Sequence, residues 1–136
     1  MIGPIATTLQ LIYALFLVAV GAYGVFWLQW ELATFYGIDA ATLAGRDGAT
    51  LLNQFRFLKA IELTFGLFCL LYRRDIMAGG LACTLFLAGV GFGFCGRGLS
   101  MVLDGRPHGA FVFFMLVEGV IFAVVWLNAR HVAANR

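Results

Sequence analysis

Charged side chains are scarce in this sequence: aspartate, glutamate, lysine and arginine together make up 12% of its 136 residues. Soluble domains usually contain roughly 25% of these residues, which cover their surface with groups that water solvates. Apolar residues make up 62% of the chain, and its mean hydropathy is +0.95. A chain this short then has too little polar surface for a water-soluble globule. The composition excludes a soluble enzyme domain, a disordered tail and a nucleic-acid-binding domain, and it predicts an integral membrane protein.

Histidine and cysteine are also rare, with two and three residues respectively. The cysteines stand singly in apolar runs without a C-x-x-C pair, so we expect buried apolar side chains at Cys69, Cys83 and Cys95. Neither His108 nor His131 lies within an apolar run, which argues against a transmembrane bis-histidine haem. His108 near Asp104 is too small a set to indicate a metal. The sequence therefore predicts no cofactor and no metal site.

Four apolar runs are long enough to cross a bilayer, which requires roughly 20 mostly apolar residues. They cover residues 5–30, 50–72, 76–103 and 109–128, approximately. The first has no charge before Glu31 and ends at Trp27 and Trp30, which suit the membrane interface. No basic segment precedes it, so a cleaved signal peptide is not expected. The sequence predicts an all-α integral membrane bundle of four transmembrane helices, forming a single domain over residues 1–136.

The connections predict an orientation. With four spans, the side of the membrane that holds both termini carries Arg73, Arg74, Arg130 and Arg136, whereas the opposite side carries Arg46 and Arg106. The positive-inside rule therefore favours cytoplasmic termini. The longest connection, residues 31–49, contains Asp39, which we expect to cap a short interfacial helix.

Several ionisable side chains lie inside the predicted spans, where each costs roughly 2.5–3.5 kcal/mol on insertion scales. In the second span Asn53, Arg56, Lys59 and Glu62 recur at every third position and so share one side of a helix. Arg97 and Glu118 lie at similar depths in the third and fourth spans. We therefore expect these side chains to form one charged cluster, which consists of Arg56, Lys59, Glu62, Arg97 and Glu118. At the non-cytoplasmic side we expect a polar mouth to this pocket, formed by Asp104, Arg106 and His108.

Three interpretations of this cluster stay open at the level of sequence. The charges can neutralise one another and tie the helices together. They can instead form a site for an anionic headgroup or substrate. The two glutamates can also act as a carboxylate pair that carries protons, since a buried carboxylate without a close cation holds its proton more tightly.

The third span places small residues on one face, where a second helix backbone can approach closely. This predicted helix-packing groove consists of Ala82, Gly89, Gly93, Gly96 and Ser100. Gly21 and Gly24 in the first span are expected to serve the same purpose.

Two groups of residues resemble a known family. The first comprises residues 53–62 followed by Gly66, Arg73 and Arg74, and the second comprises residues 96–100, the Asp104–Pro107 turn and Glu118. Together they are similar to the small bacterial four-helix membrane proteins grouped as domain of unknown function 4345, over roughly residues 5–130. The resemblance implies a four-helix fold in a bacterial inner membrane, and it implies no established reaction.

Among the possible functions, the sequence favours a non-catalytic accessory or assembly subunit that packs against a larger membrane complex, or against a second copy, through the glycine groove. The alternative is a small carrier, or a protein that binds an anionic lipid or metabolite, using the charged cluster. A lipid-modifying enzyme is a third hypothesis, but the sequence offers no activated nucleophile, and an enzyme is not expected. The bilayer is the predicted environment, and nucleic acid is not an expected partner.

Overall fold

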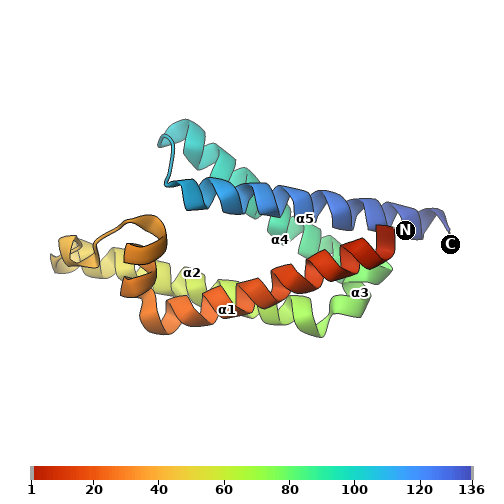
Figure 1. The fold of residues 1–136 in the computed structure, drawn as a ribbon, viewed down its shortest axis with the longest axis horizontal. Coiled ribbons are helices and arrows are strands. Elements are labelled where there is room, and N and C mark those ends of the chain that lie inside the picture. Colours follow the sequence, from red (N-terminus) through yellow and green to blue (C-terminus); the bar gives the residue numbers. More distant parts are fainter. Residues whose placement is uncertain (1, 136) are drawn as a thin grey trace. The chain divides into compact units, whose positions relative to one another are not determined.

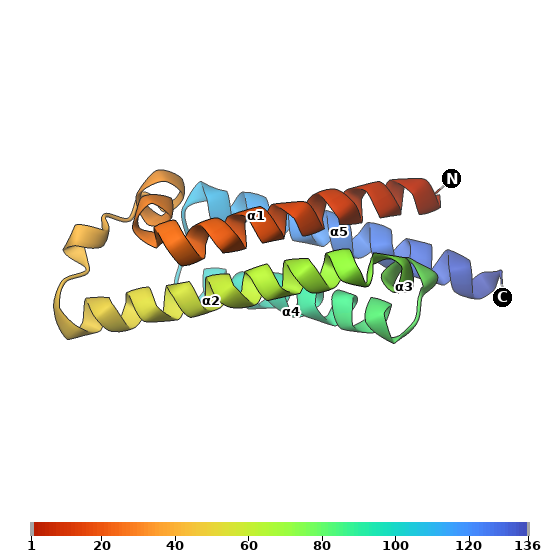
Figure 2. The ribbon, with the colours of Figure 1, turned by 90° about the horizontal axis from the view of Figure 1, so that it is seen from below.

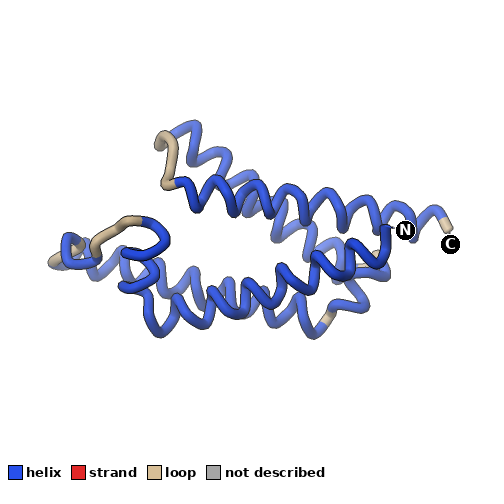
Figure 3. Tube along the Cα trace, viewed as in Figure 1, coloured by secondary structure: helices blue, strands red, loops and turns tan. Residues whose placement is uncertain are grey.

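The computed structural model describes residues 2–135, so that Met1 and Arg136, both included in the predictions above, lie outside the described residues. Within this range the chain is helical and contains no strand (Figure 3). The elements are α1 (Ile2–Tyr36), a 3-10 helix η1 (Ala40–Thr42), α2 (Gly45–Leu71), α3 (Arg73–Ala78), α4 (Leu81–Leu103) and α5 (Gly109–Ala134). The all-α prediction is confirmed.

Three helices, α1, α4 and α5, are long and apolar enough to cross a membrane. The second predicted span coincides with α2, whose 27 residues extend for about 40 Å. That length is sufficient to cross a membrane, but the charges along the middle of α2 make it less apolar than α1, α4 and α5. The first, third and fourth predicted spans therefore have the composition of membrane helices. The second predicted span, which is α2, is not confirmed by its composition.

The chain forms two compact units. One contains Ala14–Phe68, which we call the α1–α2 unit, and the other contains the described residues up to Tyr13 and from Cys69 onward, which we call the α3–α5 unit. In the first unit α1 and α2 run antiparallel, and in the second α4 and α5 do so (Figure 1).

Glycines bring α1 and α2 together. A Cβ atom at Gly21 would lie 2.5 Å from the backbone nitrogen of Leu63, and one at Gly66 would lie 2.8 Å from that of Val18. Real side chains do not tolerate such distances, so each glycine permits a backbone approach that any other residue would block. The helix-packing role predicted for Gly21 is confirmed.

α1 does not end at the interfacial tryptophans as predicted. It is kinked at Trp27, whose φ of −121° and ψ of 39° are not helical, and it then continues to Tyr36. The kink is visible as a bend in the orange part of α1 (Figure 2). Glu31, predicted to begin a loop, therefore belongs to a helix. After α1, the Asp39 carboxylate accepts a hydrogen bond from the Ala41 backbone at 2.9 Å and caps η1, as predicted.

In the α3–α5 unit, the predicted third helix is divided. Gly79, at a φ of +79°, is the C-cap of α3, and the extended Gly80 then starts α4, so the long helix begins at Leu81 rather than at residue 76. A left-handed residue ends a helix because its backbone no longer follows the helical path, and glycine adopts it without a steric penalty. The buried Asn128 side chain of α5 donates a hydrogen bond to the Met77 carbonyl at 3.1 Å and so ties α5 to α3.

The close approach of α4 and α5 uses a reciprocal arrangement of glycine and phenylalanine. A Cβ atom at Gly91 of α4 would lie 3.2 Å from the Phe122 ring, and one at Gly119 of α5 would lie 3.2 Å from the Phe94 ring. Each ring therefore packs over a bare stretch of the opposite backbone. Neither glycine belongs to the groove predicted from the sequence.

Candidate functional site

The segment of α1 after the kink carries a buried carboxylate. Leu28, Glu31 and Leu32 are spaced three and four residues apart and share one face, and each has at most 1% of its surface exposed. The glutamate is thus as deeply buried as the two leucines on its face of the helix. An ionised carboxylate in such surroundings requires a partner, because burial removes the water that would solvate it.

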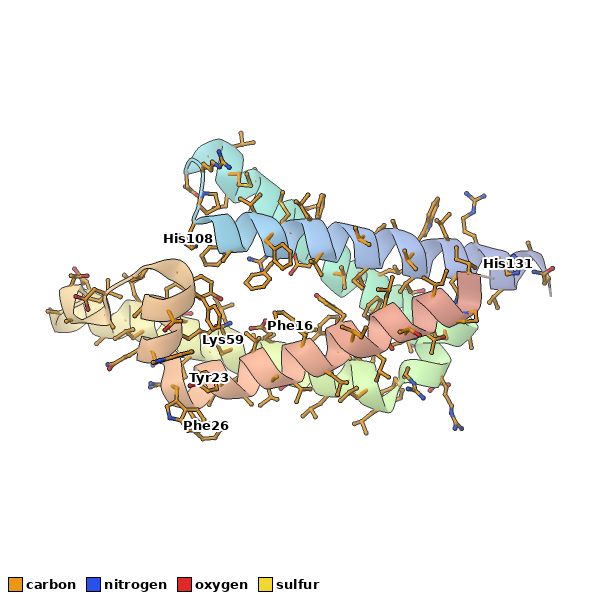
Figure 4. The ribbon with its side chains drawn as sticks, in the orientation of Figure 1. Phe16, Tyr23, Phe26, Lys59, His108 and His131 are labelled. Atoms are coloured by element: carbon orange, nitrogen blue, oxygen red, sulfur yellow. The ribbon has the colours of Figure 1, made fainter. Side chains whose placement is uncertain are left out.

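Lys59 of α2 (Figure 4) supplies that partner. Its ammonium nitrogen lies 2.5 Å from Oε1 of Glu31 and 2.9 Å from Oε2 of Glu62. The Tyr36 hydroxyl donates a hydrogen bond to Oε1 of Glu31 at 3.2 Å, and the Lys59 nitrogen lies 5.9 Å from the centre of the Tyr36 ring. We refer to Glu31, Tyr36, Lys59 and Glu62 as the Lys59 cluster.

The Lys59 cluster is not electrically balanced. One ammonium faces two carboxylates, so its formal charge is −1 when both are ionised. Oε2 of Glu31 is buried and makes no hydrogen bond within the described residues. Gly24 makes room for it, because a Cβ atom there would collide with that oxygen and with the Lys59 stem. A net negative charge in a buried site favours binding of a proton or another cation.

Arg56 lies one turn before Lys59 on α2 and is held differently. Its Nε donates a hydrogen bond to the Val25 carbonyl at 3.1 Å. Val25 is two residues before the kink, where the regular helical hydrogen bonds are interrupted and a carbonyl can accept from a side chain. Asn53, a further turn back, lines a groove together with Arg56.

Arg97 and Glu118 pair with each other in the α3–α5 unit. Nε of Arg97 lies 3.0 Å from Oε2 of Glu118, and a terminal guanidinium nitrogen lies 3.3 Å from Oε1. This two-point contact joins α4 to α5, and the Arg97 guanidinium carbon also lies 5.8 Å from the centre of the Phe111 ring. The five charges predicted to converge thus form two groups, one in each unit, and their convergence in a single pocket stays a prediction.

The residues predicted to form the pocket mouth lie at helix ends. The Ser100 hydroxyl donates to the Asp104 carboxylate at 2.8 Å at the end of α4. His108 (Figure 4) is the N-cap of α5, where its Nδ1 accepts from the Ala110 backbone at 3.4 Å. Arg106 lies exposed between them. In the predicted glycine groove Ala82 is half-buried, whereas Gly89, Gly93, Gly96 and Ser100 are exposed.

The family described as Domain of unknown function (DUF4345) matches residues 5–128. The chain belongs to this family. The resemblance seen in the sequence is thereby confirmed, and the matched region contains both charged groups. No curated protein and no solved structure matches the chain. Membership of the family carries no reaction with it, so a function has to be argued from the site.

Sequence reasoning missed two members of the Lys59 cluster, Glu31 and Tyr36. Tryptophans are typical of the end of a membrane span, and Trp27 and Trp30 stand directly before Glu31. The sequence therefore predicted that Glu31 is the first residue of a loop. The signal that could have placed it is the spacing of Leu28, Glu31 and Leu32, which continues a helical apolar face past Trp30.

Proposed function

We propose that the protein is an integral protein of a bacterial cytoplasmic membrane with four spans, of which α2 is the second, and with both termini in the cytoplasm. The pairing of Lys59 with two carboxylates supports this, because its charge is not left bare toward lipid. Near the kink the exposed Tyr23 ring stacks on Trp27 and meets Trp30 edge-on, and such exposed aromatic rings are expected at a membrane interface.

Reporter fusions test this topology. Alkaline phosphatase is active only outside the cytoplasm, so it should be active when inserted after Gly105 and inactive when fused after Asn135. The opposite pattern would reverse the orientation, and equal activity at both sites would show that α5 does not cross the membrane.

Within this membrane protein, the Lys59 cluster binds protons and the protein acts as a small proton-coupled carrier. The observation that carries this proposal is the excess carboxylate: Glu31 is 1% exposed, one of its oxygens has no partner among the described residues, and the cluster is one positive charge short. A proton on that oxygen makes the cluster neutral while Lys59 stays paired with Glu62.

The kink gives the cluster a means of responding to the proton. Glu31 and Tyr36 lie on the segment after Trp27, whereas Lys59 and Glu62 lie on α2. Protonation of Glu31 removes the charge that holds this segment to Lys59, so the segment can move at a point where the helix is already interrupted. Two arrangements that differ by one proton are what a proton-coupled carrier requires.

Proteoliposomes with an internal pH dye test the proposal. With an imposed pH gradient, wild-type protein should give proton flux that Glu31→Gln abolishes, because the amide cannot exchange a proton. Asp75→Asn is the matched control, since it removes an exposed carboxylate from α3, which does not belong to the α1–α2 unit. Unchanged flux in Glu31→Gln would refute a proton site at Glu31.

A second function, the membrane subunit, is favoured by a different observation. On α4, Gly96 is exposed and has no atom within 4 Å of the position a Cβ would occupy, so its bare backbone is open to a helix from another chain. Gentle extraction of the tagged protein, followed by mass spectrometry, should then recover a stoichiometric partner or a second copy that Gly96→Leu removes. Recovery of the wild-type protein alone would exclude this function.

A further inference from the structure

A groove runs along the α1–α2 unit beside the Lys59 cluster. It has a volume of about 530 Å³ and lies between Val25–Gln29 of α1 and the first half of α2. Pockets for small organic ligands usually have about 300–1,000 Å³. Polar side chains from both helices line it, namely Gln29, Asn53 and Arg56, over an apolar floor that includes Val25, Leu52 and Phe57.

The Arg56 guanidinium is fixed in this groove but its charge is not neutralised. Nε is held by the Val25 carbonyl, whereas the two terminal nitrogens make no hydrogen bond within residues 2–135, and no carboxylate there forms an ion pair with them. Lys59 and Arg97, by contrast, both have carboxylate partners. Anchoring of Nε restricts the side chain, so that its remaining donors are presented as a fork.

The two amides complete the polar side of the groove. Neither Gln29 nor Asn53 makes a side-chain hydrogen bond to any described residue, although each has donors and an acceptor. A ligand with negatively charged oxygens would accept from Arg56 at two points and from the amides at its edge. Its uncharged part would lie on the apolar floor.

We propose that this groove binds an amphiphilic organic phosphate, with Arg56 as its anchor and Gln29 and Asn53 as its polar contacts. The inference deepens the proposed carrier function, on which it rests, by naming the class of its substrate. The phosphate can belong to a lipid headgroup or to a soluble phosphate monoester, and both present the same oxygens to Arg56.

Binding measurements at fixed pH, without a gradient, test this site separately from proton coupling. Hexyl phosphate is titrated calorimetrically into the full-length protein in uncharged micelles, with protein-free micelles as the blank. Dioleoyl phosphatidylglycerol, with the phosphatidylcholine of the same chains as reference, is followed by native mass spectrometry. Binding of the soluble probe assigns the site to phosphate monoesters, and selective retention of phosphatidylglycerol alone assigns it to a lipid headgroup.

Variants decide whether Arg56 is responsible. Arg56→Gln should weaken binding of the retained probe by at least about tenfold, as expected for loss of charge-assisted hydrogen bonds. Asn53→Leu should weaken it less, and it offers a second test if Arg56→Gln does not fold. Arg74→Gln is the matched control, because it removes the same charge from an exposed position of α3.

Two results would overturn the inference: neither probe binds the wild-type protein, or binding is unchanged in both Arg56→Gln and Asn53→Leu. The outcome is independent of the proton site, because Glu31→Gln should retain phosphate binding at fixed pH while losing proton flux. In the wild-type protein, phosphate binding without proton flux shows that the proton site has failed, and proton flux without phosphate binding shows that the phosphate site has failed.

Discussion

Lys59→Met is the substitution whose effect follows most directly from the structure. It replaces the ammonium by an apolar group of similar length and leaves two carboxylates together. Glu31 is 1% exposed, so water cannot take over the role of Lys59. Removing one partner of a buried ion pair usually costs about 3–5 kcal/mol, because the other charge stays buried without compensation. We expect Lys59→Met to lower the free energy of unfolding by that amount.

A second substitution should restore most of the stability that Lys59→Met removes. Adding Glu31→Gln to Lys59→Met removes the uncompensated charge while keeping an oxygen that can accept from Tyr36. Buried ion pairs can be replaced by neutral groups at little cost, so the double variant should lie within about 1–2 kcal/mol of wild type.

Glu62→Gln is the matched comparison. Its side chain is 25% exposed and also contacts Lys59, at 2.9 Å. Lys59 keeps Glu31 as its partner when Glu62 is neutralised, so the expected cost is about 0–1 kcal/mol. Burial, rather than the presence of an ion pair, is therefore predicted to decide the magnitude.

Unfolding in mixed micelles with increasing dodecyl sulfate measures these differences. Trp27 and Trp30 report on the kink by fluorescence, and the third tryptophan, Trp126, reports on α5. A Lys59→Met cost below about 1 kcal/mol would refute the assignment of a buried, charged Glu31. The assignment would also be refuted if the stability lost in the double variant equalled the sum of the losses in Lys59→Met and Glu31→Gln, because the two penalties would then be independent.

Three further predictions use the same unfolding assay. Gly21→Leu should destabilise the protein by about 1–3 kcal/mol, because its Cβ would collide with the Leu63 backbone, and no effect would contradict the close helix contact. Gly96→Ala should instead stabilise it by about 0.5–1 kcal/mol, since nothing lies within 4 Å and alanine favours a helix; a loss would show that the surface is occupied. A double-mutant cycle on Arg97 and Glu118 should give a coupling of about 1 kcal/mol, kept small because the Arg97 side chain is 34% exposed, and zero coupling would show that the pair does not stabilise the fold.

Much of the helical architecture was predictable from local sequence. Long apolar runs indicated the helices, Asp39 was a recognisable cap for a short helix, and Gly21 was a recognisable packing residue. The three-residue spacing from Asn53 to Glu62 placed the charges of α2 on one side. These features depend on neighbours within one or two turns, and the geometry of a helix makes such relationships regular.

The positions at which helices are interrupted were harder to predict from the sequence. The kink at Trp27 has no proline near it, and Gly79 ends α3 inside an apolar run that reads as continuous. In both places local composition allows a helix to continue. Whether it does depends on what the neighbouring helix offers, as when Arg56 donates to the Val25 carbonyl near the kink.

The sequence by itself determined that this protein is helical, suited to a membrane, and charged along one side of α2. Only the tertiary structure decided which charges are partners: Lys59 pairs with Glu31 from a segment read as a loop, and Arg97 pairs with Glu118 in the other unit. The physical reason is that helical periodicity sets the direction of a side chain within its own helix. Its partner on another helix is set by the distance between two backbones, which depends on glycine contacts and kinks far apart in the chain.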